Sequence, residues 1–139
     1  MRHRYMTPLS IVVTIVAAVL CAACAESFEE RCRRECQEYT ANQCPRQLDE
    51  CTRLDSMTFV ENPTGFCYCY SVSGILDNDS IYTDEAQVQK FRDALVQNVR
   101  TDIGLRQCKE HGFTFTYAYV SESTGEELMR HIIVPEDYQ

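Results

Sequence analysis

The chain has 139 residues, of which 13 are basic and 21 acidic, so its net charge is −8 at neutral pH. A chain this acidic is a poor candidate for general binding to nucleic acid or to an anionic membrane, and neither is expected as a partner. The length suits a single domain with a modest core.

The first 25 residues predict a signal peptide. Arg2 and Arg4 supply a positive start, residues 11–20 are apolar except for Thr14, and Ala23-Cys24-Ala25 suggests cleavage after Ala25. A transmembrane anchor is one alternative, but the apolar run reaches only about 15 residues and a span needs roughly 20. A lipoprotein anchored at Cys24 is another, although Cys21 stands where that signal normally has leucine.

Cleavage changes both charge and cysteine content. Residues 26–139 keep 11 basic and 21 acidic side chains, which gives a charge of −10, and seven of the nine cysteines. In an oxidising compartment this cysteine density is typical of a disulfide framework. We therefore predict one secreted, cysteine-rich domain over residues 26–139.

Two pairs of cysteines have matching spacings. Side chains alternate across a strand, so Cys67 and Cys69 in residues 66–70 share one face, roughly 6.6 Å apart. Cys32 and Cys36 lie one turn apart on one helix face, at roughly 6 Å. The sequence thus predicts a helix stapled to a strand by two disulfides.

This C-x3-C helix with its C-x-C strand resembles the cysteine-stabilised α/β scaffold of defensins and scorpion-type toxins. The resemblance is carried by Cys32, Cys36, Cys67 and Cys69 and covers residues 27–72. It implies the local stapling geometry, and no channel-blocking or antimicrobial residue is carried over from it.

The N-terminal helices come first in the mature chain. Ser27 and Glu30 form a capping box, and a helical stripe follows at Phe28, Cys32, Cys36 and Tyr39. Pro45 ends this helix and can open a second, in which Leu48, Cys51 and Leu54 recur at three-residue steps. Cys44 and Cys51 bracket that piece and form the predicted third bridge.

Two hairpins are predicted. In the first, strands at 57–61 and 66–72 are joined by the turn Asn62-Pro63-Thr64-Gly65. In the second, residues 113–120 alternate cleanly, Glu122-Ser123-Thr124-Gly125 is a turn, and 128–134 return as a strand, although 126–131 could instead begin a short helix. The tail after Pro135 is predicted to be loose.

A polar loop and the longest helix separate the hairpins. Asn78-Asp79-Ser80 in the loop is an acceptor sequence for N-linked glycan. The helix is predicted over 83–103, capped by Thr83 and stopped by Gly104. Its apolar stripe consists of Val88, Phe91, Leu95, Val99 and Ile103.

The expected fold is α+β. It is a small disulfide-stapled domain in which a four-stranded antiparallel sheet has the long helix on one face and the cysteine helix on the other. Cys108 is the odd cysteine: it is a free thiol, the bridge of a disulfide-linked homodimer, or bridged within the chain so that a different cysteine is left over.

No catalytic constellation is evident. His111 and His131 have no spacing that favours acid–base chemistry over two surface histidines. The C-x3-C and C-x-C spacings favour disulfides over zinc ligation, so neither a metal nor a cofactor is expected.

The predicted function is therefore that of a secreted, non-enzymatic effector of venom, salivary or parasite type. It would present a rigid surface to an extracellular receptor, channel or protease. The turn at Asn62, Pro63, Thr64 and Gly65 is the expected contact, together with Glu122–Gly125, because loops on rigid scaffolds commonly carry recognition. An extracellular carrier of a small apolar ligand and a small hydrolase using His111 or His131 remain alternatives.

Overall fold

The computed structural model describes residues 25–139, and the chain divides into two units, 1–31 and 32–139. The signal-peptide and lipoprotein predictions concern residues 1–25 and so fall almost entirely outside the described residues. In the first unit, the Ser27 amide donates to the Glu30 carboxylate at 2.9 Å. The Glu30 amide donates to the Ser27 hydroxyl at 3.1 Å, which confirms the predicted capping box.

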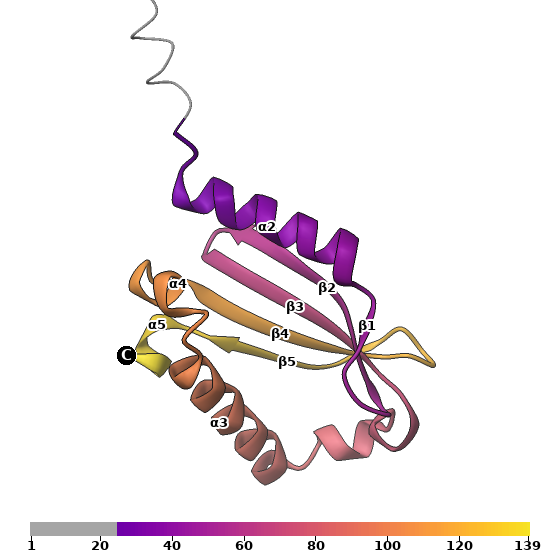
Figure 1. The fold of residues 1–139 in the computed structure, drawn as a ribbon. Coiled ribbons are helices and arrows are strands. Elements are labelled where there is room, and N and C mark those ends of the chain that lie inside the picture. The colour runs from indigo at the N-terminus through magenta and orange to yellow at the C-terminus, as the bar shows by residue number, and fades with distance from the viewer. Residues whose placement is uncertain (1–24) are drawn as a thin grey trace, which may run out of the picture. The chain divides into compact units, whose positions relative to one another are not determined.

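The second unit is built on a five-stranded mixed sheet of order β1-β2-β3-β4-β5 (Figure 1). The strands are β1 Arg46–Gln47, β2 Thr52–Glu61, β3 Thr64–Val72, β4 Thr114–Ser121 and β5 Glu127–Ile133. β3 and β4 are parallel, and the other neighbours are antiparallel. The predicted four-stranded antiparallel sheet is wrong, because the long connection from 73 to 113 lets β4 return in the direction of β3.

The helices are α2 Phe28–Gln43, α3 Glu85–Thr101, α4 Arg106–Glu110 and α5 Pro135–Tyr138, with short 3₁₀ turns η1 Gly74–Leu76 and η2 Asp79–Tyr82. The predicted second helix after Pro45 is wrong. Leu54 lies on β2, opposite Tyr70 of β3, and is buried. The predicted helix was based on apolar residues at three-residue steps, and so short a helix is not stable alone. Pairing with β3 stabilises this stretch as a strand instead.

The sheet has an inner and an outer face, defined by the strand register. The inner face carries Phe59, Phe66, Tyr68, Tyr70, Phe115, Tyr117, Tyr119 and Ile133. The outer face carries Thr58, Cys67, Cys69, Thr116, Ala118 and Arg130. Rings on the inner face stack in register across β3 and β4: Tyr70 and Tyr119 lie 4.8 Å apart between centroids, and Tyr68 and Tyr117 lie 5.1 Å apart.

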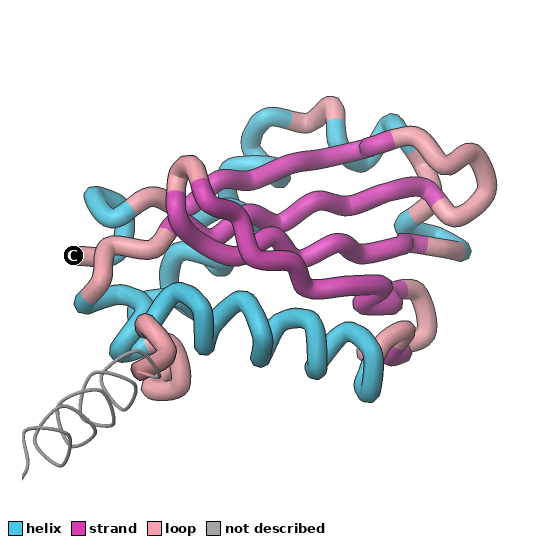
Figure 2. Tube along the Cα trace, turned by 90° about the horizontal axis from the view of Figure 1, so that it is seen from above, coloured by secondary structure: helices cyan, strands magenta, loops and turns pink. Residues whose placement is uncertain are grey.

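Both long helices contact the inner face, so the predicted placement of one helix on each face is wrong. From α3, the Phe91 ring packs edge-on against Tyr119 at 5.3 Å. From α2, the Thr40 hydroxyl bonds the backbone of Met57, whose side chain lies opposite Tyr68. In Figure 2, α2 runs alongside the strands as a separate layer. The aromatic face offers the larger apolar area, and burying it drives both helices to one side.

The predicted staple between α2 and β3 is wrong for the same reason. Cys32 and Cys36 are buried under α2 on the inner side of the sheet, whereas Cys67 and Cys69 project from the outer face. A bridge between the two pairs would have to pass through the sheet. No disulfide is found among the seven cysteines of residues 25–139, Cys44 and Cys51 included.

Cys108 is not an exposed linker. It lies on α4, its side chain is buried, and its thiol is within hydrogen-bonding reach of Cys32. An interchain bridge through Cys108 would require α4 to move off the domain. The dimer remains a prediction, and this burial weighs against it.

In the C-terminal half, the observed helix and strands agree more closely with those predicted from the sequence. α3 begins after Asp84, whose carboxylate accepts from two helix amides, and it buries Leu95 and Val99, while Ile103 is 85% exposed beyond its end. The strands predicted for the second hairpin are confirmed. The predicted loose tail is wrong: α5 is anchored by the buried Tyr138, whose hydroxyl donates to the Phe113 carbonyl at 2.7 Å.

Gly65 should be essential for the β3–β4 pairing. A Cβ atom at this position would lie 1.8 Å from the Thr114 carbonyl oxygen, which is backbone and cannot swing aside. We expect Gly65→Ala to lower the free energy of unfolding by at least about 2 kcal/mol in urea titration. Gly104→Ala is the control, because there the nearest atom is a side-chain oxygen of Asp102. Equal unfolding midpoints for the two variants would contradict this role.

The tyrosine ladder should make the fold sensitive to alkali. Burial raises the pKa of Tyr70 to about 12, and it also raises the pKa of Tyr68, Tyr117 and Tyr119. Unfolded tyrosines ionise near pH 10, so the folded state binds more protons above that pH. The contribution of these phenols to the free energy of unfolding should be fully present below about pH 10 and should be lost as the pH rises towards about 12.

The measurement is the urea midpoint at about pH 8, 10 and 11, with a reductant to keep the thiols reduced. Tyr70→Phe should show a shallower fall than the unmodified chain, because one raised phenol has been removed. A midpoint that does not change over this range would contradict the burial of these phenols.

Candidate functional site: the groove between α2 and β2

The edge of β2 that faces away from β3 is largely without a neighbouring strand. β1 pairs only with Arg53 and Leu54 of β2, so within residues 25–139 no strand covers the same edge from 55 to 61. An unpaired edge presents backbone donors and acceptors that can bind another strand. This stretch is therefore a candidate for binding.

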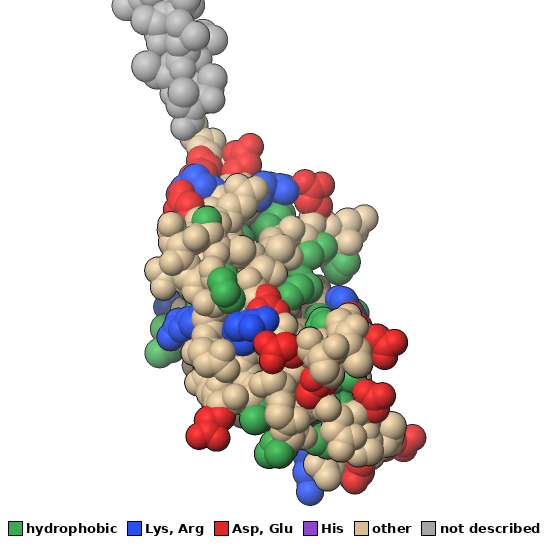
Figure 3. All heavy atoms as spheres, turned by 90° about the vertical axis from the view of Figure 1, so that its right-hand side faces the viewer, with side chains coloured by type: hydrophobic (Ala, Val, Ile, Leu, Met, Phe, Trp, Pro, Cys, Tyr) green, Lys and Arg blue, Asp and Glu red, His purple; other side chains and the backbone are tan. Residues whose placement is uncertain are grey.

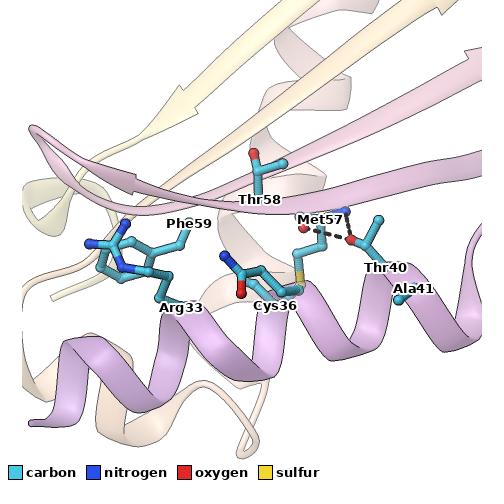
Figure 4. Close-up of a pocket in the computed structure, with 8 residues that line it drawn as sticks. Arg33, Cys36, Thr40, Ala41, Met57, Thr58 and Phe59 are labelled. Carbon is cyan, nitrogen blue, oxygen red and sulfur yellow. Dashed lines mark hydrogen bonds between the residues drawn. The ribbon is translucent and has the colours of Figure 1, made fainter.

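A groove of about 360 Å³ runs between this edge and α2 (Figure 4). Its lining consists of Arg33, Cys36, Gln37, Thr40 and Ala41 from α2 and Met57, Thr58 and Phe59 from β2. The α2 residues are at helical spacing and the β2 residues are consecutive, so the walls are one helix stripe and one strand edge. The volume is at the lower end of the range found for ligand pockets.

Thr40 closes the end of the groove opposite Arg33 (Figure 4). Its hydroxyl donates to the Met57 carbonyl at 2.7 Å and accepts from the Met57 amide at 2.9 Å, as the dashed lines in Figure 4 show. A single side chain thus satisfies both outward-facing backbone groups of one edge residue. The next residue with this orientation along the strand is Phe59, since backbone direction alternates along a strand.

Arg33 forms one end of the groove. Its guanidinium lies 4.7 Å from the centre of the Phe59 ring and pairs with the Glu61 carboxylate at 2.7 Å. Both charged side chains are largely exposed, so the ion pair itself adds little stability. The contact holds a cation over an aromatic ring beside the open edge, where it can meet an acidic group of a ligand.

One buried thiol lines the groove. Cys36 is the thiol in its lining, and burial, followed by the neighbouring Cys32, raises its pKa to about 12. A thiol that remains protonated at neutral pH is a poor nucleophile. Hydroxyl, amide, thioether and aromatic groups make up most of the remaining lining.

The predicted contact turn lies at the Arg33 end of the groove. Asn62 and Pro63 are exposed at the tip between β2 and β3. Thr64 is half-buried and donates to the Glu61 carbonyl at 3.0 Å, whereas Gly65 is buried against β4. Half of the predicted turn is thus available for contact, whereas Gly65 is needed for the pairing of β3 with β4.

The other predicted residues lie elsewhere. Glu122 pairs with Arg53 at 2.9 Å in the loop between β4 and β5. Asn78 is exposed, with its side chain accepting from the Ser80 amide, so glycosylation there stays a prediction. On the side seen in Figure 3, acidic side chains are scattered among polar and hydrophobic ones.

The two histidines lie in unlike surroundings. His131 is buried on the inner face, where its ring packs at 5.8 Å from the Phe91 ring, and burial lowers its pKa. His111 is exposed at the end of α4, with Nδ1 at 2.8 Å from the Gln107 carbonyl. Neither lines the groove, and a hydrolase role for them stays a prediction.

The sequence analysis missed the α2 wall of the groove. Gln37, Thr40 and Ala41 lie beside the cysteine stripe and were not singled out. The available signal was the small side chains of Thr40 and Ala41 near the end of a helix that is otherwise rich in long side chains. Which strand edge they face depends on the sheet order, which the sequence does not specify.

Two kinds of feature are absent from the described residues. No group of three or more histidine, cysteine or acidic side chains within residues 25–139 is arranged to hold a metal ion. In the same residues, no helix combines the length and apolar character needed to cross a bilayer.

Comparison with protein families assigns the chain to one family. It belongs to the family described as Domain of unknown function (DUF8479), which matches residues 27–129. No curated protein sequence matches it.

Two solved structures share the fold. One is a proposed secreted protein from Pseudomonas aeruginosa, with a TM-score of 0.66 and 16% identity, covering 83% of this chain and 100% of that one. The other is EpsS, the pilotin of the type 2 secretion system of Vibrio vulnificus, with a TM-score of 0.58 and 11% identity, covering 80% of this chain and 91% of that one. At these identities the likeness concerns the fold alone.

Thr40 should hold α2 against the β2 edge. Replacing it with the isosteric valine removes both hydrogen bonds to Met57, and we expect a loss of about 1–2 kcal/mol in the free energy of unfolding. Thr58→Val is the matched control, because the Thr58 hydroxyl lies 3.5 Å from its acceptor on the outer face. If both variants unfold at the same urea concentration, the Thr40 contact does not stabilise the helix on the edge.

Proposed function

We propose that this chain is an exported, non-enzymatic binding protein that holds an extended segment of a partner protein in the groove between α2 and β2. The observation that carries the proposal is the uncovered edge of β2 beside an apolar groove. Such an edge can accept a further strand, with backbone hydrogen bonds giving affinity and side-chain pockets giving specificity.

The contacts favour an extended segment over a compact ligand. Beyond Met57, the outward backbone groups of Phe59 lie next to its ring and to Arg33, so a strand could add alongside residues 59–61. An acidic side chain on that strand could replace Glu61 on the Arg33 guanidinium. The expected partner segment is therefore apolar and carries one acidic residue.

Export is supported by the N-terminal sequence and, as an analogy of fold, by the two structural neighbours. One of these is described as a proposed secreted protein and the other belongs to a secretion system. The narrower prediction of a venom, salivary or parasite-type effector of a receptor, channel or protease has no further support, and neither do its toxin-like and glycoprotein features.

A carrier of a small apolar ligand is the second candidate. The mostly apolar walls near Met57 and Phe59 favour it, and a volume of about 360 Å³ would admit a small molecule. Native mass spectrometry of the purified chain would reveal a retained small molecule if this were the function.

Site-specific photocrosslinking tests the binding site. A photoreactive amino acid at Ala41, on the α2 wall, should crosslink to one defined segment of one exported protein of the host cell. Phe59→Ala should reduce this crosslink at least about fivefold, because it removes the aromatic floor under Arg33.

The same reagent at Asn62 and at Thr124 tests the two turns predicted from the sequence. Crosslinks from these turns without any from Ala41 would rule out the groove and favour loop-based recognition. A synthetic peptide of the mapped segment should compete with the Ala41 crosslink, and failure to compete would contradict direct binding.

A further inference from the structure

We propose that Cys67 and Cys69, on the outer face of the sheet, form a two-thiolate binding site for a soft monovalent metal ion, Cu(I). The site lies on the opposite side of the sheet from the aromatic face and is independent of the function proposed for the groove.

The two thiols converge at one point of the outer face. Their sulfur atoms are 3.9 Å apart, and both side chains are partly exposed. Their neighbours in the register are small: Thr58 and Ser56 on β2 and Thr116 and Ala118 on β4. These four side chains therefore leave the sulfur atoms open to an ion from solvent.

The geometry does not suit a disulfide between the two residues. Side chains at i and i+2 of a strand project in parallel, so their Cβ atoms are about 6.6 Å apart. A disulfide needs Cβ atoms roughly 3.5–4.5 Å apart, which the strand could reach only by leaving its pairing with β2 and β4. Held between two neighbours, β3 keeps both thiols as separate ligands.

The same separation suits a bridging ion. A two-coordinate ion prefers a linear arrangement, in which two metal–thiolate bonds of about 2.3 Å place the sulfurs roughly 4.6 Å apart. The pair reaches this separation from 3.9 Å by a small rotation about each χ1. Thiolates select soft ions, of which Cu(I) is bound stably by two sulfurs. Ions that demand four protein ligands are disfavoured, since residues 25–139 contain no cluster of three or more candidate ligands.

Charge favours the bound state. Cu(I) displaces one proton from each thiol without any change in oxidation state, leaving a bis-thiolate complex of charge −1. The Arg130 guanidinium, opposite Ala118 on β5, is within hydrogen-bonding reach of Cys67 and can offset that charge. Arg130 is held in place by Glu127 at 2.7 Å.

The test is an anaerobic titration of the reduced protein, isolated in its exported form, with Cu(I) against a chromophoric Cu(I) chelator. We expect one high-affinity ion per chain, and at least a 100-fold weaker affinity in C67S/C69S. Arg130→Met should weaken binding about tenfold, as expected of a group that supports a ligand.

C44S/C51S is the matched control, because these two cysteines are also partly exposed, and it should bind within about threefold of the unmodified chain. If the double variant C67S/C69S fails to fold by circular dichroism, the single variants C67S and C69S serve in its place, and each should lose the site. Unchanged affinity in folded C67S/C69S or in both single variants would overturn the proposal. So would mass-spectrometric mapping of a Cys67–Cys69 disulfide in protein isolated in air.

Discussion

The parallel pairing of β3 with β4 is the constraint on which the rest of the structure depends. It requires Gly65, whose missing side chain lets the Thr114 carbonyl approach. The pairing places Phe66 beside Phe115 and stacks Tyr68 on Tyr117 and Tyr70 on Tyr119. A continuous aromatic face of this size must be buried, and α2 and α3 both pack on it. The opposite face is left with the thiols of Cys67 and Cys69 among mostly small side chains, together with Arg130.

Placing both helices on one face also creates the groove. α2 lies over the β2 side of the sheet and follows an edge that β1 covers only at Arg53 and Leu54. Thr40 joins the helix to the uncovered part of that edge through both backbone groups of Met57. A helix held beside an unpaired strand makes a binding surface whose backbone groups can recognise any extended chain, and whose apolar and cationic walls can select among chains.

The sheet separates the cysteines into two chemical environments. Cys36 and Cys108 are buried near Cys32, and burial raises the pKa of each to about 12, so they behave as apolar core residues. Cys67 and Cys69 are partly exposed beside Arg130. Cysteines thus have different roles in the two environments. Side chains alternate along β3, so a strand that turns its aromatic rings inward turns the two cysteines between them outward.

The sequence by itself determined the local structure: the capping box at Ser27, the strand alternation around Cys67, the helix that buries Leu95 and Val99, and the second hairpin. Each depends on neighbours a few residues apart, and their periodicity is visible in the chain. Only the tertiary structure decided the parallel β3–β4 pairing, the common face of α2 and α3, the anchoring of Tyr138 and the groove beside Thr40. These depend on contacts between residues far apart in sequence, where the arrangement is set by which apolar faces become buried against each other. A spacing match such as that of the two cysteine pairs cannot reveal which side of the sheet each pair will occupy.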